Sequence, residues 1–185
     1  MERLLLLHAP YLRKVLQIRI HPELAPRVDL SDVEQETRMT IMKRIEEFAT
    51  QRSCSFRVWL RRRAIEQLAD EYRRHIAAEK RSVRREVQRS DQSSMVIARA
   101  LVHASLSERL HRQELAEQIR QLIETLPAND QEILTLRYAE GLSNREAAEA
   151  LDVPIDTVRK RYGRAIRRLV EKVTAAGLKD SISFE

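Results

Sequence analysis

The sequence predicts an all-α protein made of two small helical domains joined by a polar linker. Only three glycines and five prolines interrupt its 185 residues. No run alternates apolar and polar side chains over the length of a strand, whereas apolar residues often recur at three- and four-residue intervals. We expect residues 1–78 to form the first domain, 79–105 the linker, 106–175 the second domain, and 176–185 a frayed tail.

The first domain contains a helix with one apolar and one acidic-polar face. Ser31 and Glu34 have the spacing of a capping box, which predicts a helix from Asp32 to about Phe48. Its inner face would carry Val33, Thr37, Ile41, Ile45 and Phe48. Its outward stripe would carry Asp32, Gln35, Glu36 and Met39. Acidic residues also favour a solvated helix N-terminus, so the stripe has a purely structural alternative.

A second, strongly basic helix is predicted over residues 56–74, after a short polar loop. Its apolar seam consists of Phe56, Leu60, Ala64, Leu68 and Tyr72, with many arginines outside the seam. The linker that follows, at residues 79–105, is charged and rich in serine. Such a composition buries little apolar surface, so we expect at most transient helix at residues 95–102.

The second domain begins with two helices whose ends are marked by turn residues. The first has one apolar stripe and stops at Pro127; the stripe comprises Leu115, Ile119, Leu122, Ile123 and Leu126. The second ends at Gly141, a typical C′ residue, and its apolar residues are Ile133, Leu134, Leu136 and Tyr138.

Residues 141–169 predict a helix-turn-helix. Ser143 and Glu146 form a capping box for its first helix, and the Asp152-Val153-Pro154 segment ends that helix. The second helix would bury Ile155, Val158, Tyr162, Ile166 and Leu169. Its opposite face would carry Thr157, Lys160, Arg161, Arg164 and Arg168, flanked by Arg159 and Arg167. A cationic helix of this kind suits the major groove of DNA; the alternative is a solvated basic face on an ordinary helical hairpin.

Charge and composition narrow the class of function. The formal net charge is +6, and the basic residues are concentrated in two stretches, residues 57–89 and 159–172, which predict two contacts with a polyanion. Cys54 is the sole cysteine, which favours the reducing cytoplasm. The histidines lack ligand spacing, and neither a phosphate loop nor a nucleophile–base constellation is recognisable. We therefore expect no enzymatic activity, no metal, no cofactor and no membrane insertion.

Three blocks of sequence resemble the extracytoplasmic-function (ECF) group of bacterial RNA polymerase sigma factors, in the sigma-70 family. Residues 29–37 are similar to the segment that docks on the polymerase clamp helices. Residues 56–74 are similar to the segment that opens and recognises the −10 promoter element. Residues 126–169 are similar to the domain that recognises the −35 element. The resemblance implies a two-domain promoter-specificity subunit whose second domain is a sigma region 4 type, winged-helix-like helix-turn-helix.

The resemblance assigns roles to residues and partners. The partners would be core RNA polymerase, promoter DNA and an anti-sigma factor, in the cytoplasm. Polymerase contacts would come from Asp32, Gln35, Glu36 and Met39. Contacts to the −10 element would come from Trp59, Arg62, Arg63, Glu66, Arg73 and Arg74. Contacts to the −35 element would come from Thr157, Arg159, Lys160, Arg161, Arg164 and Arg168.

Several of these residues have an alternative structural role. Trp59 is a large apolar residue suited to a domain core. The arginines after it can pair within their helix with Glu66, Asp70 and Glu71. The family commonly carries a small polar amide at the position of Glu66, in a pocket for a flipped −10 base. A carboxylate there accepts a hydrogen bond from an exocyclic amine but repels phosphate.

Two other functions are compatible with a basic helix-turn-helix. One is a free-standing transcriptional regulator whose first domain is a dimerisation or sensor module. The other is a helical adapter whose basic faces bind RNA or acidic proteins. Binding to core RNA polymerase distinguishes a sigma factor from both of these alternatives.

Overall fold

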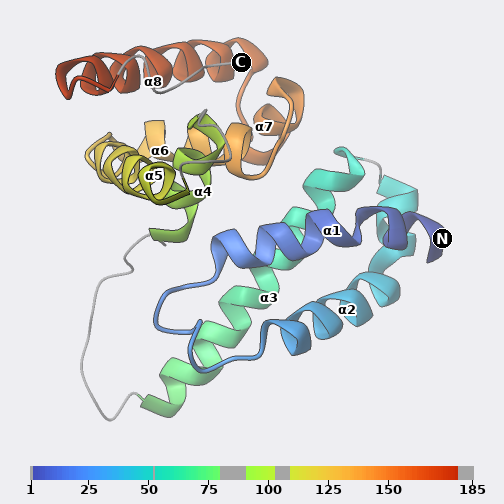
Figure 1. Ribbon diagram of the computed structural model, residues 1–185. Helices are drawn as coiled ribbons and strands as arrows, with labels where there is room; N and C mark the ends of the chain where they lie inside the picture. Colours follow the sequence, from blue (N-terminus) through green and yellow to red (C-terminus); the bar gives the residue numbers. More distant parts are fainter. Residues whose placement is uncertain (1, 52, 80–90, 103–108, 179–185) are drawn as a thin grey trace. The chain divides into compact units, whose positions relative to one another are not determined.

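The computed structural model describes residues 2–51, 53–79, 91–102 and 109–178, and its elements are helices (Figure 1). The chain divides into two compact units, Met1–Ser90 and Asp91–Glu185. The all-helical class and the presence of two domains are therefore as predicted. Each unit is described by itself below.

The described part of unit 1 consists of three helices, of which α3 contacts both others. Its elements are α1 (Glu2–Arg19), α2 (Leu30–Gln51) and α3 (Phe56–Glu79). All three helices contribute to one apolar core, whose members include Leu12, Leu16, Ile41, Leu60 and Ala64. The predicted inner face of α2 is confirmed, because Val33, Thr37, Ile41 and Ile45 are buried. Phe48 packs against the core at the edge of this face.

The start of α2 differs from the sequence prediction. Asp29 caps the helix: its carboxylate accepts a hydrogen bond from the Ser31 N–H (2.8 Å), and its carbonyl accepts one from the Val33 N–H (3.2 Å). The capping box expected from Ser31 and Glu34 is therefore wrong. The Glu34 carboxylate points instead toward arginines of α1 and α2, which offer stronger, charge-assisted hydrogen bonds.

In unit 2, the residues that the structure describes form five α-helices and one π-helical turn. Its elements are α4 (Asp91–Leu101), α5 (Arg109–Glu124), α6 (Ala128–Leu134), the π-turn η1 (Thr135–Ala139), α7 (Asn144–Leu151) and α8 (Ile155–Ala175). In Figure 1, α8 lies across α5 and α6, and it contacts α7 as well. The buried residues of unit 2 form the second core, in which Ile119, Ile133, Leu136 and Leu169 are fully enclosed.

Helix α4 corrects the predicted linker. Residues 91–102 belong to unit 2, where α4 packs on α5 and η1. Four apolar residues of this stretch are buried: Ile97, Ala98, Leu101 and Val102. Four apolar residues in a polar stretch suffice to fix a helix when a complementary surface exists, and composition alone does not reveal that surface. The rest of the predicted linker, 80–90 and 103–105, lies outside the described residues.

The helix expected to end at Gly141 is present but changes pitch. It begins as α6 and widens into η1, where the Glu140 N–H bonds to the Thr135 carbonyl (2.8 Å). Gly141 follows with φ 68°, the left-handed conformation expected of a C′ glycine.

On α5, the Arg120 guanidinium bonds to Glu117 and Glu124. The hydrogen bond from Arg120 lowers the pKa of Glu117, and the bond to Glu117 raises the pKa of Arg120.

Candidate functional site

The helix-turn-helix is built from local signals that the structure confirms. The Ser143 hydroxyl accepts the Glu146 N–H (3.2 Å), and the Glu146 carboxylate accepts the Ser143 N–H (2.8 Å). This is the predicted capping box of α7. Helix α7 ends at Leu151 and is followed by Asp152 in a left-handed conformation (φ 53°); Pro154 occupies the N-cap position of α8. These turns fix the direction in which α8 leaves α7.

The buried stripe of α8 differs in part from the predicted one. The buried residues are Val158, Ala165, Leu169 and Val173. Ile155 was expected to be buried, but it is 36% exposed because it opens the helix beyond the packed contact. Tyr162 lies half-buried at the edge of the core. Its hydroxyl lies 3.2 Å from that of Tyr138, and the Arg137 guanidinium lies 5.3 Å from its ring.

The solvent face of α8 carries a concentrated positive charge. Arg159, Lys160, Arg164 and Arg167 are exposed, whereas Thr157 and Arg161 are half-buried. Arg159 lies 3.1 Å from Asp156, one turn earlier. Among the described residues, no carboxylate lies within ion-pair distance of Lys160, Arg164 or Arg167. These side chains are therefore available to an external polyanion.

Arg168 differs from the other basic residues of α8. Its guanidinium bonds to the buried carboxylate of Asp130, at 2.5 Å, and so ties α8 to α6. Asp130 also lies in the first turn of α6, where a negative charge is favourable. This contact gives Arg168 a structural role beside the DNA contact expected from the sequence.

Three arginines of α3 pair with carboxylates of the same helix. Arg63 lies 2.8 Å from Glu66, and Arg74 lies 2.9 Å from Glu71. Arg73 pairs with Asp70. These are the intrahelical pairs that sequence spacing allowed. Arg62 is exposed.

Trp59 lies in the core of unit 1 and not on its surface. It is buried, and its ring packs beside those of Phe48 and Phe56 at centroid distances of 5.3 and 5.9 Å. The Arg63 guanidinium lies 5.9 Å from the same ring. Trp59 therefore has the core position that its size suggested, and the Arg63 side chain beside it is only 13% exposed.

The outward stripe of α2 is partly as expected. Asp32, Gln35 and Met39 are exposed. Glu36 is half-buried, because its carboxylate accepts a hydrogen bond from Gln67 (2.7 Å) and lies 3.6 Å from Arg74, both on α3. Met42, one turn beyond Met39, continues the exposed stripe.

Met42 was missed by the sequence analysis. It is 57% exposed and Met39 is 50% exposed, so α2 presents two large apolar side chains to solvent. Exposed apolar groups beside polar ones are typical of a protein-binding surface. Extending the i, i+3, i+7 pattern by three residues would have found Met42.

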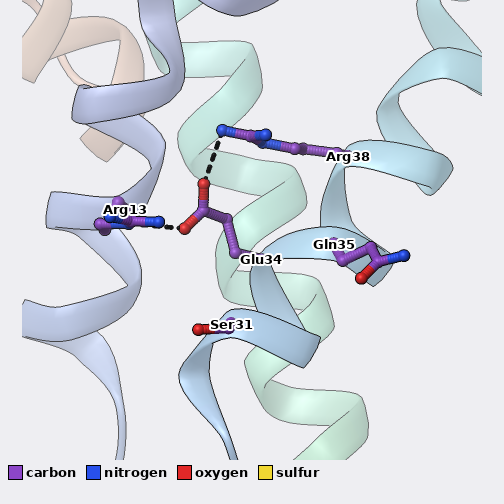
Figure 2. A pocket seen from close by; sticks show the side chains of 5 residues that line it. All are labelled: Arg13, Ser31, Glu34, Gln35 and Arg38. Carbon is purple, nitrogen blue, oxygen red and sulfur yellow. Dashed lines mark hydrogen bonds and ion pairs between the residues drawn. The ribbon is translucent and has the colours of Figure 1, made fainter.

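A buried carboxylate lies directly behind this stripe (Figure 2). The Glu34 side chain is 6% exposed and lies 2.7 Å from both the Arg13 and the Arg38 guanidinium. Gln35, the next residue, turns away from this cluster toward solvent. The cluster ties α1 to α2 and so fixes the side of α2 that faces outward.

The described residues contain no group of His, Cys, Asp and Glu side chains arranged to bind a metal ion. Nor is any of the described helices long and apolar enough to cross a membrane. Among the described residues, the basic faces of α3 and α8 and the outward stripe of α2 are the surfaces suited by charge or exposure to a partner.

Comparison with known proteins matches both units. The family model for sigma-70 region 2 matches residues 4–76, and the model for sigma-70 region 4 matches residues 116–169. The chain is 32% identical over 152 residues to the ECF RNA polymerase sigma-E factors of Escherichia coli K12 and Salmonella typhi. That alignment covers 80% of this chain and 75% of each relative.

Solved structures share the fold. The structure of CnrH in complex with the cytosolic domain of CnrY matches with a TM-score of 0.53 and 23% identity, covering 94% of this chain and 87% of CnrH. RpoE from Bartonella quintana, in complex with the anti-sigma factor NepR, matches with a TM-score of 0.50 and 20% identity. That match covers 94% of this chain and 96% of RpoE.

Proposed function

This chain belongs to the ECF group of the sigma-70 family, and from that premise we propose which of its surfaces perform each task of a sigma factor. It directs RNA polymerase to promoters and is not itself an enzyme. The free-standing regulator and the adapter are excluded, because the region 2 model matches the first unit as well.

The −35 element would be bound by the solvent face of α8. The observation that supports this most directly is the row formed by Lys160, Arg164 and Arg167, which no carboxylate among the described residues neutralises. Arg159 extends the row toward the start of the helix, where recognition helices contact base edges. Thr157 and Arg161 would contribute from the edge of this face, and Arg168 through the part of its guanidinium that Asp130 leaves exposed.

The −10 element would be bound by the basic face of α3. Its contacts would come from Arg62, Arg63, Glu66, Arg73 and Arg74. Trp59 would act indirectly, by packing beneath Arg63. Because Arg63, Arg73 and Arg74 already have carboxylate partners, phosphate must compete with those partners.

Core polymerase would bind the outward stripe of α2, defined by Asp32, Gln35, Met39 and Met42. The stripe combines an acid, an amide and two thioethers, and a protein partner can bury all of them. Glu36 would contribute from the edge, because α3 already occupies part of its carboxylate.

The division of labour would follow the two units. Residues 1–78 would bind polymerase and the −10 element, and residues 106–175 would bind the −35 element, with α4 added to the second domain. The site of action is the cytoplasm, where core polymerase and the chromosome are found. An anti-sigma factor is a further partner that we propose, since NepR is named as one in a structural relative.

Binding to core polymerase tests the α2 assignment. The double variant Asp32→Lys, Met39→Ala should bind immobilised core polymerase about 1–3 kcal/mol more weakly, because a charge and a buried apolar contact are lost. Helicity should not change, since both side chains are exposed. Lys43→Ala, an exposed change on the same helix, is the control. Wild-type binding by the double variant would contradict the assignment.

Run-off transcription with the reconstituted holoenzyme on a genomic library identifies the promoters. The selected −10 and −35 sequences then provide the DNA for every experiment below. If the holoenzyme transcribes none of the fragments in the library, the proposed division of labour is contradicted.

A further inference from the structure

Gly163 lies in the middle of α8, where neither the backbone nor the packing of unit 2 requires a glycine. The chain has only three glycines. Gly141 and Gly177 have positive φ angles of 68° and 74°, which explains both. Gly163 has no such conformation, and a Cβ built on it meets, among the described residues, no atom within 4 Å beyond its chain neighbours and the adjoining helix backbone.

Glycine destabilises this position of the helix without any compensation inside the domain. In an exposed helix interior, glycine is less favourable than alanine because it gains more freedom in the unfolded chain. Alanine would fit here without a clash. The described part of unit 2 thus supplies no structural reason for the glycine, which points to an external ligand.

The surroundings of Gly163 indicate what approaches it. An open hollow of about 550 Å³ lies over its Cα, lined by Arg159, Lys160, Gly163, Arg164 and Arg167. The four cations occupy positions −4, −3, +1 and +4 relative to the glycine, so they surround it on one face. A polyanion held by these side chains meets bare helix backbone at the centre.

We propose that Gly163 is the point of closest approach between α8 and DNA, where the C5-methyl group of a −35 thymine enters the hollow. Glycine offers no side-chain donor or acceptor, so the matching base edge in the major groove is an apolar one, and thymine supplies it. The cations around it bind the flanking phosphates. The inference rests on the proposed binding of the −35 element by α8.

The experiment compares thymine with deoxyuridine, which lacks only the methyl group. Each −35 thymine of a promoter selected by run-off transcription is replaced in turn, and binding is measured with holoenzyme containing the full chain. One replacement should weaken binding by the wild type about fourfold, the value of one buried methyl group. Holoenzyme containing Gly163→Ala should bind the thymine promoter about tenfold more weakly and lose this dependence on the methyl group.

Unfolding of the free chain separates a lost contact from a damaged fold. Gly163→Ala should raise the melting temperature, because alanine favours the helix and nothing crowds its Cβ. Thr174→Ala, an exposed change three turns along α8, is the matched control. It should also stabilise the helix and should leave promoter binding unchanged.

Three results would overturn the inference. One is wild-type promoter binding by Gly163→Ala. Another is a weakening by Gly163→Ala that is equal for thymine and deoxyuridine at every −35 position, which would place phosphate over the glycine. The third is a −35 element without thymine. The proposed binding of the −35 element by α8 is tested separately with Arg164→Ala. If this variant binds the promoter as tightly as the wild type, α8 is rejected as the −35 surface.

Discussion

The two basic helices of this sigma factor use similar side chains in different ways. On α3, Arg63, Arg73 and Arg74 are each paired with a carboxylate of the same helix, and Arg74 also reaches Glu36 on α2. On α8, the row formed by Lys160, Arg164 and Arg167 has no carboxylate partner among the described residues.

The difference separates two designs for DNA binding. In unit 1, three cations that can contact DNA already pair with carboxylates, and Arg74 also connects α3 to α2, so stability and binding share side chains. In unit 2 the two tasks meet only at Arg168, which ties α8 to Asp130, whereas Lys160, Arg164 and Arg167 face solvent. Phosphate binding by α3 therefore requires an exchange of partners, whereas binding by α8 does not.

The largest effect is expected where a charge of unit 1 is buried. In the double variant Arg13→Met, Arg38→Met, the Glu34 carboxylate would stay buried without a partner. Unfolding free energy should fall by about 3 kcal/mol, because an unpaired charge in the interior is costly. Urea denaturation followed by Trp59 emission measures it, since Trp59 is the sole tryptophan and lies in the core of unit 1.

Glu34→Gln is the control for this change. It removes the buried charge and leaves two half-exposed arginines to water, so it should cost less, about 1 kcal/mol. A larger loss for Glu34→Gln than for the double arginine variant would contradict the assignment of Glu34 as the group that needs partners.

A smaller pair of effects should separate the two roles within α8. Arg168→Met should destabilise unit 2 by about 2 kcal/mol. The buried Asp130 carboxylate would lose its guanidinium partner and would be stabilised only by the N-terminal end of the α6 dipole. Arg164→Ala should leave unfolding unchanged and weaken promoter binding by about 2 kcal/mol if the side chain contacts a base. If it contacts only phosphate, the salt dependence of binding should decrease by about one unit.

Far-UV circular dichroism follows the helices of both units and Trp59 emission reports unit 1 alone, so a transition seen only in the dichroism belongs to unit 2. Promoter binding is measured with holoenzyme at several salt concentrations. Loss of stability in Arg164→Ala, or none in Arg168→Met, would show that α8 does not divide its residues between the two tasks.

The parts of the fold that the sequence predicted well depend on contacts close in the chain. The cap of α7 joins residues three apart, and the left-handed turn at Gly141 depends on one residue. The same rule failed at Ser31 and Glu34, because arginines of α1 and α2 compete for the Glu34 carboxylate. Only the tertiary structure brings Arg13 beside it.

In the candidate DNA-binding site too, the sequence predicted local features and missed contacts between residues far apart in the chain. The basic face of α8 follows from helical periodicity, so Arg159, Lys160 and Arg164 were found. The pairing of Arg168 joins residues 38 apart in sequence, and no local pattern indicates it. Gly163 appeared as an ordinary helix residue until the structure placed it in the floor of a hollow.

The smallest effect on stability is expected at Glu66. Removing its charge would leave Arg63 on α3 without this carboxylate partner, just as Lys160, Arg164 and Arg167 on α8 have none among the described residues. The half-exposed carboxylate of Glu66 lies 2.8 Å from Arg63 and 3.9 Å from Arg44. Exposed pairs of this kind contribute little, so Glu66→Gln should change the unfolding free energy of unit 1 by less than about 0.5 kcal/mol.

Its effect on DNA should be larger than its effect on stability. The change releases Arg63 and replaces a group that repels phosphate with the amide common in the family. Binding of holoenzyme to the −10 element should strengthen, and its salt dependence should increase by about one unit as Arg63 becomes free for phosphate. The base preferred at one −10 position should change, because an amide both donates and accepts whereas a carboxylate only accepts. Unchanged affinity and base preference would place Glu66 away from the −10 strand, and α3 would then bind DNA through its arginines alone.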